Sequence, residues 1–573
     1  MSKSLKTDIL IFFSIWAFYS LLSALNPIMP DFDWQNYHHY NAWAVLNDRL
    51  NFDFLAANSR TCINPICNVI NYFLMSKLNN HPYLFFVISS LDSAFLMFFA
   101  YKIINYLFSG TEKLWLRRTS LIFSFLFLFY TPLIINETDF SRNDAFVGMF
   151  VLSGFYIFIK NYFDNFTKKR LFWLFLSGIL FGTALGLKLS VYPMIIALGI
   201  IFLVFYKESK NIIKDVFSLF VGILMSFLIL DGWWIVKCYT IFKNPFFPYF
   251  NDIFRSPFGD IVNHLPYEYI YSTPTNFFQW LLCPFLREEN FVFFLENGGF
   301  EPRFAIAYVS VIVLFILLFV SYRSKKFANS FDFIGRKKLL SILIFVSVSY
   351  VFDLMTFGTN GRFLTGIFPL FAIITVSLIV AIFKNSKFSK IFILLNLSII
   401  LIYSWLISSF GILYSMNVLL EEEGFSEKAK PIAKIIDSKD LNFSNNSVLL
   451  LVSQGTSFIA PFQNKTVQYV GFQVQADVFE KYKDEIFPLD IFLYARYFPS
   501  KYNEKYNQDL ILSDKKIYII FYEGDFLTLL FAALDEYNSY RSVPRQIKNC
   551  RFLSGEIFNT DWAFRDNYVC EFN

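Results

Sequence analysis

"DILIFFSIWAFYSLLSALNPIMPDFDWQNYHHYNAWAVLND", residues 8–48, joins two stretches of opposite character. Residues 8–25 form an apolar run that is long enough to cross a bilayer as a helix. Residues 30–48 contain three Asp, two adjacent His and two Tyr. Ionisable groups so close to lipid are costly unless they have partners or line a cavity. This junction therefore predicts a membrane span followed by a loop with a function at the membrane surface.

The composition of the whole chain requires a lipid environment. The 573 residues are 55% hydrophobic and only 17% charged, with a mean hydropathy of +0.46, whereas soluble domains carry about 25% charged residues. Apolar runs of spanning length occur at residues 8–25, 82–108, 119–135, 144–161, 171–187, 189–206, 214–234, 303–322, 339–357, 363–383 and 389–411. We expect an all-α polytopic membrane protein with about eleven transmembrane helices.

Basic residues fill alternate loops between these runs, as the positive-inside rule requires. This pattern predicts a multi-pass protein of the cytoplasmic membrane, with the N-terminus in the cytoplasm and the C-terminal region outside. The run at residues 8–25 is interpreted as an uncleaved first span, because no small-x-small cleavage site follows it. Cytoplasmic loops beside anionic lipid account for the net charge of +5, so no nucleic-acid partner is expected.

The sequence predicts two domains. Residues 1–411 form the membrane part, with external loops at 26–81 and 235–302, and residues 412–573 form an extracytoplasmic domain. In the first loop, helical spacing predicts a flat interfacial helix at Trp34–Asn47, and Asn64–Leu78 is expected to be a second short helix or a re-entrant segment. In the tail, strand-like runs at Val448–Val452 and Lys516–Tyr522 alternate with helical patterns such as Phe526–Tyr537. The tail is therefore expected to be a small α/β domain.

Six cysteines are scattered along the chain without the CxxC spacing of a metal site. Cys550 and Cys570 lie in the tail, on the side expected to be external. In an oxidising compartment these two are the expected disulfide, and free thiols are the alternative.

Charged residues gather at the external ends of several spans. The groups are Asp31, Asp33, Asn36, His38 and His39; Glu137, Asp139, Arg142 and Asp144; Lys188; and Arg362. Acidic side chains and single basic side chains at the same membrane face are what a binding site for an anionic, membrane-anchored substrate would need. Structural explanations remain open, since Asp33 and Asp144 could each cap a helix and the three cations could reach toward lipid headgroups.

The adjacent pair His38 and His39 raises the question of a metal site. Neighbouring residues on a helix point about 100° apart, so both rarely bind one ion. No cofactor is expected, and a divalent metal remains an alternative because carboxylates and histidines can hold one.

The overall pattern resembles the GT-C superfamily. It combines a first span that ends in an acidic external loop, a flat helix, about eleven spans and an external C-terminal domain. The stretches "DFDWQNYHHYNAWAVLNDRL", "NETDFSRNDAF", "GLKLS" and "KNPFFPYFNDIFRSP", with Asn64–Pro65, more narrowly resemble a poorly characterised bacterial group of GT-C-like proteins. The resemblance covers residues 1–411, and the tail matches only in its placement. It implies an integral-membrane glycosyltransferase that uses a polyprenyl-phosphate-linked sugar.

The resemblance also implies roles for individual residues. An acid of the first external loop, Asp33 or Asp31, is the general base toward the acceptor hydroxyl, with Asp33 preferred because it directly precedes the interfacial helix. Arg362 is the candidate for binding the donor phosphate, with Lys188 and Arg142 as further candidates. The remaining candidates are the acids Glu137 and Asp144 of the second loop and the substrate contacts Asn36, Tyr37, His38 and His39.

Such a transfer would be an inverting single displacement onto a glycan, lipid or protein acceptor. The alternative within the same pathway is a polymerase or ligase of lipid-linked glycans, although those proteins carry their charges in a late loop. A lipid or glycan transporter is the alternative from another class, and it predicts mid-span charges and related halves. Only Asp92, Asp231 and Asp353 are visible mid-span charges, and no half-repeat is apparent.

Overall fold

A computed structural model gives the fold of most of the membrane part and of the strands of the tail. It describes residues 3–25, 33–53, 56–78, 81–109, 114–129, 131–135, 143–163, 169–209, 211–247, 249–255, 302–323, 334–357, 361–383, 443–451, 465–471, 516–522, 546–553 and 567–572, with a few isolated positions between them.

The chain divides into two compact units. The helical unit consists of Met1–Pro27, Phe86–Trp233 and His264–Glu423. The loop–sheet unit consists of Ile28–Phe85, Trp234–Asn263 and Gly424–Asn573. Segments of both expected external loops thus group with the tail. The expected domain boundary at residue 411 remains a prediction, because residues 403–442 lie outside the described residues.

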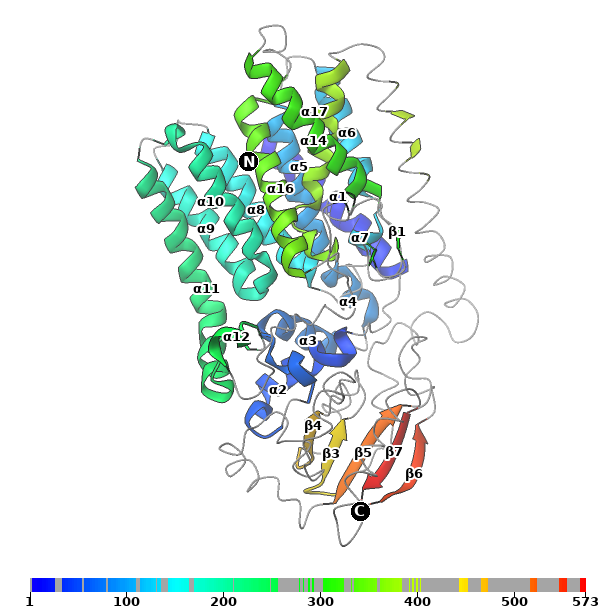
Figure 1. Cartoon of the computed structure of the whole chain (residues 1–573). Helices are drawn as coiled ribbons and strands as arrows, with labels where there is room; N and C mark the ends of the chain where they lie inside the picture. Colours follow the sequence, from blue (N-terminus) through cyan, green and yellow to red (C-terminus); the bar gives the residue numbers. More distant parts are fainter. Residues whose placement is uncertain are drawn as a thin grey trace. The chain divides into compact units, whose positions relative to one another are not determined.

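The helical unit is built from long apolar helices (Figure 1). They are α1 (Lys3–Leu25), α5 (Leu91–Leu107), α6 (Leu114–Phe129), α7 (Pro132–Ile135), α8 (Asp144–Phe163), α9 (Arg170–Leu187), α10 (Tyr192–Val204), α14 (Pro302–Arg323), α16 (Arg336–Phe357) and α17 (Phe368–Phe383). Two more, α4 (Pro82–Ser89) and α11 (Ile212–Phe242), run from one unit into the other. In the bundle α8 packs against α5 and α9, α10 against α16, and α14 against α17.

Within the described residues, seven helical stretches are long and apolar enough to cross a membrane. They are Leu5–Ala24, Tyr83–Leu107, Asp144–Phe163, Arg170–Leu187, Ile212–Phe242, Arg303–Arg323 and Arg336–Thr356. Each coincides with a run expected from the sequence. The runs at 189–206 and 363–383 form the shorter apolar helices Leu189–Val204 and Phe368–Ile382. The run at 119–135 is divided between α6 and α7, and most of 389–411 lies outside the described residues. The total of eleven spans therefore remains a prediction.

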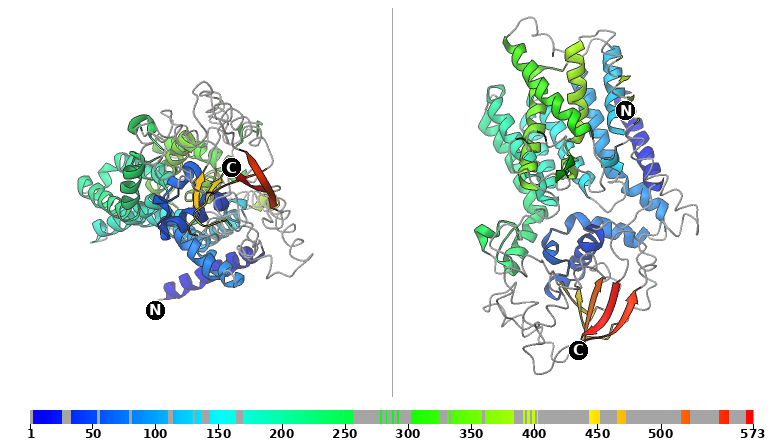
Figure 2. Two further views of the ribbon diagram at one scale, coloured as in Figure 1. Left: turned by 90° about the horizontal axis from the view of Figure 1, so that it is seen from below. Right: turned by 45° about the vertical axis from the view of Figure 1, so that its right-hand side comes forward.

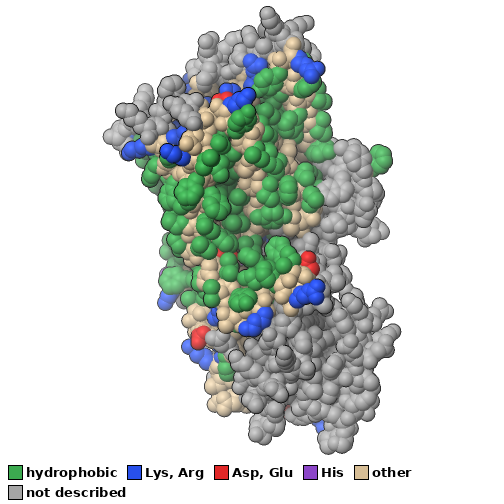
Figure 3. Space-filling model, turned by 60° about the vertical axis from the view of Figure 1, so that its left-hand side comes forward, with side chains coloured by type: hydrophobic (Ala, Val, Ile, Leu, Met, Phe, Trp, Pro, Cys, Tyr) green, Lys and Arg blue, Asp and Glu red, His purple; other side chains and the backbone are tan. Residues whose placement is uncertain are grey.

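The outer surface of the helical unit is strongly apolar on one side (Figure 3). On α11, large apolar side chains stay exposed along successive turns, including Ile213, Phe217, Phe220, Leu224, Leu228 and Ile229. So continuous an apolar surface is typical of helices that contact lipid.

The loop–sheet unit confirms the helix expected at Trp34–Asn47, and the second segment of the first loop is also helical. A π-helical turn at Trp34–His38 continues into α2 (His39–Leu46), and α3 (Ile66–Leu78) packs against α2. The short helix α12 (Asn251–Phe254) belongs to the same unit.

The tail contributes a five-stranded sheet with the order β4-β3-β5-β7-β6 (Figure 2). Its strands are β3 (Val448–Leu451), β4 (Gln468–Gly471), β5 (Ile517–Tyr522), β6 (Ile547–Leu553) and β7 (Asn567–Phe572). β3 pairs in parallel with β4 and β5, whereas β7 runs antiparallel to β5 and β6. The two strand-like runs of the tail are thus confirmed as β3 and β5. The helical pattern expected at Phe526–Tyr537 lies outside the described residues.

A separate antiparallel pair, β1 (Arg287–Glu288) with β2 (Phe291–Val292), lies in the second expected external loop. That loop also begins later than expected, because α11 continues to Phe242.

Candidate functional site

Three charged residues from separate elements meet in the helical unit. Asp144 is the first residue of α8, where the helix dipole favours a negative charge. Lys188 follows the last residue of α9 in an extended conformation, which turns the chain toward α10. Arg362 belongs to the short 3-10 turn Gly361–Leu364 before α17. The sequence named all three as candidates without a way to show that they are neighbours.

The carboxylate of Asp144 lies between the two cations. Lys188 Nζ donates a hydrogen bond to Asp144 Oδ1, and Arg362 Nε lies 3.4 Å from Asp144 Oδ2. The Lys188 ammonium is also 4.7 Å from the centre of the Phe363 ring. Of the two cationic side chains, Lys188 is 26% exposed and Arg362 only 4%. The cluster therefore presents one accessible cation and one buried cation around a shared carboxylate.

Asp353 adds a second carboxyl group to this cluster. It lies on α16, is 2% exposed and interacts electrostatically with Asp144 and Lys188. Its Oδ1 makes no hydrogen bond within the described part of the chain. In the sequence, Asp353 is recognisable only as a mid-span charge. Two cations surround the carboxylate of Asp144, and the more accessible of them, Lys188, can bind an anion.

Asp33 begins the helical segment of the first loop, in the loop–sheet unit. It is buried, it has helical backbone angles and it makes no capping hydrogen bond to the turn that follows. The Asp33 side chain therefore does not cap the helix that follows it. The turn itself is π-helical, and such turns occur frequently at functional sites. Asp31 lies outside the described residues.

The two histidines of the loop have different surroundings. His39 is buried, with its ring 4.5 Å from that of Trp34 and 5.0 Å from that of Tyr72. Burial lowers the pKa of His39 to about 3, so this ring is neutral at physiological pH. His38 is only partly buried, and its ring contacts Tyr37 at 4.1 Å. Of the pair, His38 is thus the more accessible.

The structure says little or nothing about several other candidate residues. Glu137 and Arg142 lie outside the described residues, and Asn36 is described only by its backbone in the π-helical turn. Among the residues that the structure describes, no three His, Cys, Asp or Glu side chains gather as a metal site would require.

A buried network that the sequence analysis missed connects the first loop with the tail inside the loop–sheet unit. Arg49 and Asp53 form an ion pair at 2.6 Å between Nη2 and Oδ1. Tyr40 Oη donates to Asp53 Oδ2 at 2.9 Å, and the backbone N–H of Tyr469 donates to Asp53 Oδ1 at 2.9 Å. Despite Arg49, burial raises the pKa of Asp53 to about 6. The only sequence signal was the Arg–Asp spacing of four residues.

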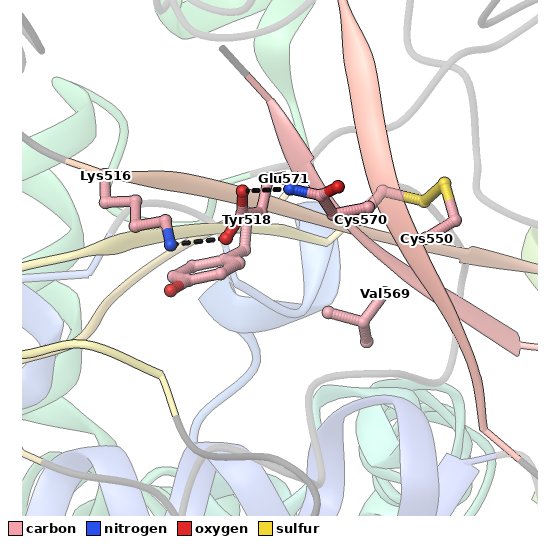
Figure 4. A pocket seen from close by; sticks show the side chains of 7 residues that line it. Lys516, Tyr518, Cys550, Val569, Cys570 and Glu571 are labelled. Carbon is pink, nitrogen blue, oxygen red and sulfur yellow. Dashed lines mark hydrogen bonds and ion pairs between the residues drawn. A yellow bond between two sulfur atoms is a disulfide. The ribbon is translucent and has the colours of Figure 1, made fainter.

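A pocket of about 490 Å³ is lined by residues at β5, β6 and β7 of the sheet (Figure 4). Its polar side chains already pair with one another, because Glu571 bonds both Lys516 and Asn549. Cys550 and Cys570 are joined by a disulfide beside it, on the adjacent strands β6 and β7. This is the pairing that the sequence suggested.

Comparison with known proteins gives a likeness of fold. No protein-family model and no curated protein matches the chain. Among solved structures, the chain is similar to ArnT from Cupriavidus metallidurans in the apo state, with a TM-score of 0.50 and 10% sequence identity over 99% of this chain and 98% of that chain. For ArnT of the same organism bound to undecaprenyl phosphate, the TM-score is 0.49 and the identity 10%, over 99% of this chain and 97% of that chain. The apo comparison shows that the chain has an ArnT-like fold.

Proposed function

We propose that this protein is a membrane glycosyltransferase of the GT-C type, which transfers a sugar from a polyprenyl-phosphate donor to an acceptor hydroxyl with inversion. Its ArnT-like fold supports a GT-C transferase in general. The observation that carries the proposal is the cluster of Asp144, Lys188 and Arg362, in which two cations from separate loops surround one carboxylate. A phosphate-linked donor requires such a cationic site.

Lys188 and Arg362 have different tasks in this proposal. The more exposed Lys188 meets the donor phosphate, whereas the buried Arg362 holds Asp144 and adds its positive field. When the bond between sugar and phosphate breaks, negative charge develops on the phosphate. Cations that are already fixed in a water-poor site stabilise that charge without reorganising. Asp144 supplies this preorganisation, because it holds both cations before the donor arrives.

Asp33 is the general base of the proposed reaction. The acceptor oxygen forms a bond to the anomeric carbon while the bond from that carbon to the phosphate oxygen breaks. The hydroxyl proton passes to the Asp33 carboxylate, and the bonding electron pair leaves with the phosphate. A phosphate leaves without being protonated, so the acid catalyst of glycoside hydrolysis is not needed. One displacement inverts the anomeric centre.

The first experiment compares the masses of the cell's surface glycans with and without the protein. Loss of one sugar residue of defined mass is the expected result. Glycans of unchanged composition but lower surface amount would indicate a transporter and contradict the proposal. Asp33→Asn should abolish the sugar addition while the protein still inserts into the membrane. Full activity of this variant would exclude Asp33 and leave Asp31 to be tested.

Asp48→Asn is a matched control for Asp33→Asn. Asp48 lies in the same loop, is exposed, and has a φ of 53°, a conformation that Asn tolerates well. This isosteric substitution should leave sugar addition unchanged. Arg362→Ala should reduce sugar addition far more than it reduces the amount of folded protein in the membrane.

A further inference from the structure

The edge strand β4 of the tail's sheet lies against the first loop rather than at a free edge. β4 pairs with β3 on one side, where the N–H of Gln468 donates to the Ser447 carbonyl at 3.0 Å. Backbone groups alternate along a strand, so the neighbouring groups, the Val467 carbonyl and the Tyr469 N–H, face away from β3. An unpaired edge of this kind normally needs protection.

Arg49 and Asp53 take the place of a neighbouring strand at this edge. Arg49 Nη2 donates to the Val467 carbonyl at 2.5 Å, and Asp53 Oδ1 accepts from the Tyr469 N–H at 2.9 Å. One side chain of the pair thus donates and the other accepts, as a paired strand would. Arg49 Nη1 also donates to the Lys465 carbonyl at 2.5 Å. These contacts join residues more than 400 positions apart.

The ion pair is too deeply buried to be an ordinary surface contact. The side chains of Arg49 and Asp53 are 6% and 1% exposed. The Arg49 guanidinium lies 4.4 Å from the Phe52 ring centre, 5.2 Å from that of Trp43 and 5.5 Å from that of Tyr469. Burying two charges costs several kcal/mol each unless further hydrogen bonds compensate. Here the compensation comes from the strand backbone, so the pair and β4 depend on each other.

The same pair holds the helix that begins at Asp33. Residues 33–46 are helical without a break, from Asp33 through the π-helical turn into α2. Within this segment, the fully buried Tyr40 donates to Asp53 Oδ2 at 2.9 Å. Trp43, one turn later, packs its ring edge-to-face on Tyr469 of β4 at 6.4 Å. The helix and the edge strand thus share one buried anchor.

We propose that Arg49 and Asp53 are positioning residues of the transferase, which couple the tail's sheet to the Asp33 helix so that both hold one orientation. This inference rests on the proposed role of Asp33. Neither residue is a catalytic group. They act through Tyr40 and α2, and the sheet becomes a working part of the catalytic unit rather than an appended domain.

Hydrogen exchange in the full-length protein in lipid nanodiscs tests the coupling. Arg49→Lys keeps the charge but loses the planar fork of donors, and Asp53→Asn keeps the shape but replaces one of the two acceptor oxygens with an amide donor. Each should speed amide exchange at least tenfold in both residues 33–46 and residues 465–471. Lys516→Gln is the control, since it removes a partly exposed ion pair at the same sheet, between the residue before β5 and Glu571 of β7, and should leave both segments unchanged. Loosening of residues 465–471 alone would overturn the proposal.

Tyr40→Phe tests the contact between the Asp33 helix and Asp53 separately from the contacts between the ion pair and β4. It removes only the hydroxyl that reaches Asp53, while Arg49 and Asp53 keep their bonds to β4. It should speed exchange in residues 33–46, leave the Tyr469 amide protected, and lower sugar addition per folded molecule at least threefold. Normal sugar addition despite a loosened helix would refute the positioning role. Should Asp33→Asn prove active while the exchange results hold, the proposed base is wrong and the coupling stands.

Discussion

Replacing Gly182 by alanine should destabilise the helical unit, because this glycine lies where α9 and α11 touch backbone to backbone. A Cβ at position 182 would stand 2.2 Å from the Ile223 carbonyl oxygen and 2.2 Å from Ser226 Oγ. One turn earlier, a Cβ at Gly178 would stand 2.1 Å from the Leu219 oxygen. Small residues four positions apart permit such close approach between membrane helices.

The cost follows from these distances. Ordinary contacts begin at 3.4 Å, so α11 would have to move away from position 182 by about 1.2 Å. A gap of about 0.5–1 Å already forfeits about a quarter to a half of the dispersion energy between facing atoms, and this displacement is larger. Overpacking costs about 1–3 kcal/mol, and the upper end applies here because a backbone oxygen has no rotamer by which to turn aside.

Gly199→Ala on α10 is the matched control, since a Cβ there meets nothing within 4 Å. Alanine raises helix propensity by about 1 kcal/mol at either position, so that contribution cancels in the comparison. We expect Gly182→Ala to lower the free energy of unfolding by about 2 kcal/mol, and Gly199→Ala to raise it by up to about 1 kcal/mol. Reversible denaturant unfolding in mixed micelles, followed by circular dichroism, measures both.

A double-mutant cycle with Gly222→Ala tests the same contact from the other helix, where a Cβ would meet the Phe175 oxygen at 2.3 Å. Once one alanine has separated the helices, the second should cost less, so the double variant should lose less stability than the sum of the two single losses. Equal stabilities of Gly182→Ala and Gly199→Ala, or strict additivity in the cycle, would refute the close packing of α9 on α11.

Two further predictions concern the buried charges. Because the pKa of Asp53 is raised to about 6 from an unfolded value of 3.8, the folded state binds a proton that the unfolded state releases. The stabilising contribution of Asp53 is therefore fully present below pH 4 and is lost as the pH rises through 6. Lowering the pH from 7 to 5 should stabilise the wild type relative to Asp53→Asn by about 1 kcal/mol in unfolding experiments. Asp144→Asn should both destabilise the helical unit and reduce sugar addition at least tenfold, whereas adding Lys188→Met should restore charge balance and stability but not sugar addition. Recovery of sugar addition in that double variant would contradict the role of Lys188.

The sequence predicted the elements whose formation depends on local composition. A long apolar run in lipid must satisfy its backbone hydrogen bonds without water, and a helix does so within the run itself. Within the part of the chain that the structure describes, seven of the expected runs are helices of spanning length. The α2 segment was recognisable from helical spacing, and β3 and β5 from strand-like runs. For the α3 segment the sequence left a short helix and a re-entrant segment open, and the structure shows a helix. The strand β4 was not recognised, since four residues with the sequence "QYVG" carry little pattern of their own.

The sequence could not predict contacts that depend on which distant segments meet. Arg49 and Asp53 were overlooked because their importance lies in the backbone of residues 465–469, more than 400 positions away. The glycines of α9 form a small-xxx-small pattern that is visible in the sequence, but their partner Gly222 on α11 is identified only by the packing. Local patterns predict elements, whereas a buried polar network is specified by tertiary structure.

The burial of Arg362 helps to distinguish a cation of a binding site from a cation that contacts lipid headgroups. A cation that reaches toward headgroups buries its apolar stem and keeps its charged end in water. Arg362 is instead 4% exposed and lies beside Asp144, so the headgroup explanation does not fit this residue. Lys188 is more exposed, yet its ammonium also bonds Asp144. Asp144 thus holds both cations close to its buried carboxylate. Such buried ion pairs contribute little to the stability of a fold, because replacing them with apolar residues is often neutral or stabilising. The buried arrangement of these charges is therefore consistent with the anionic ligand that we propose.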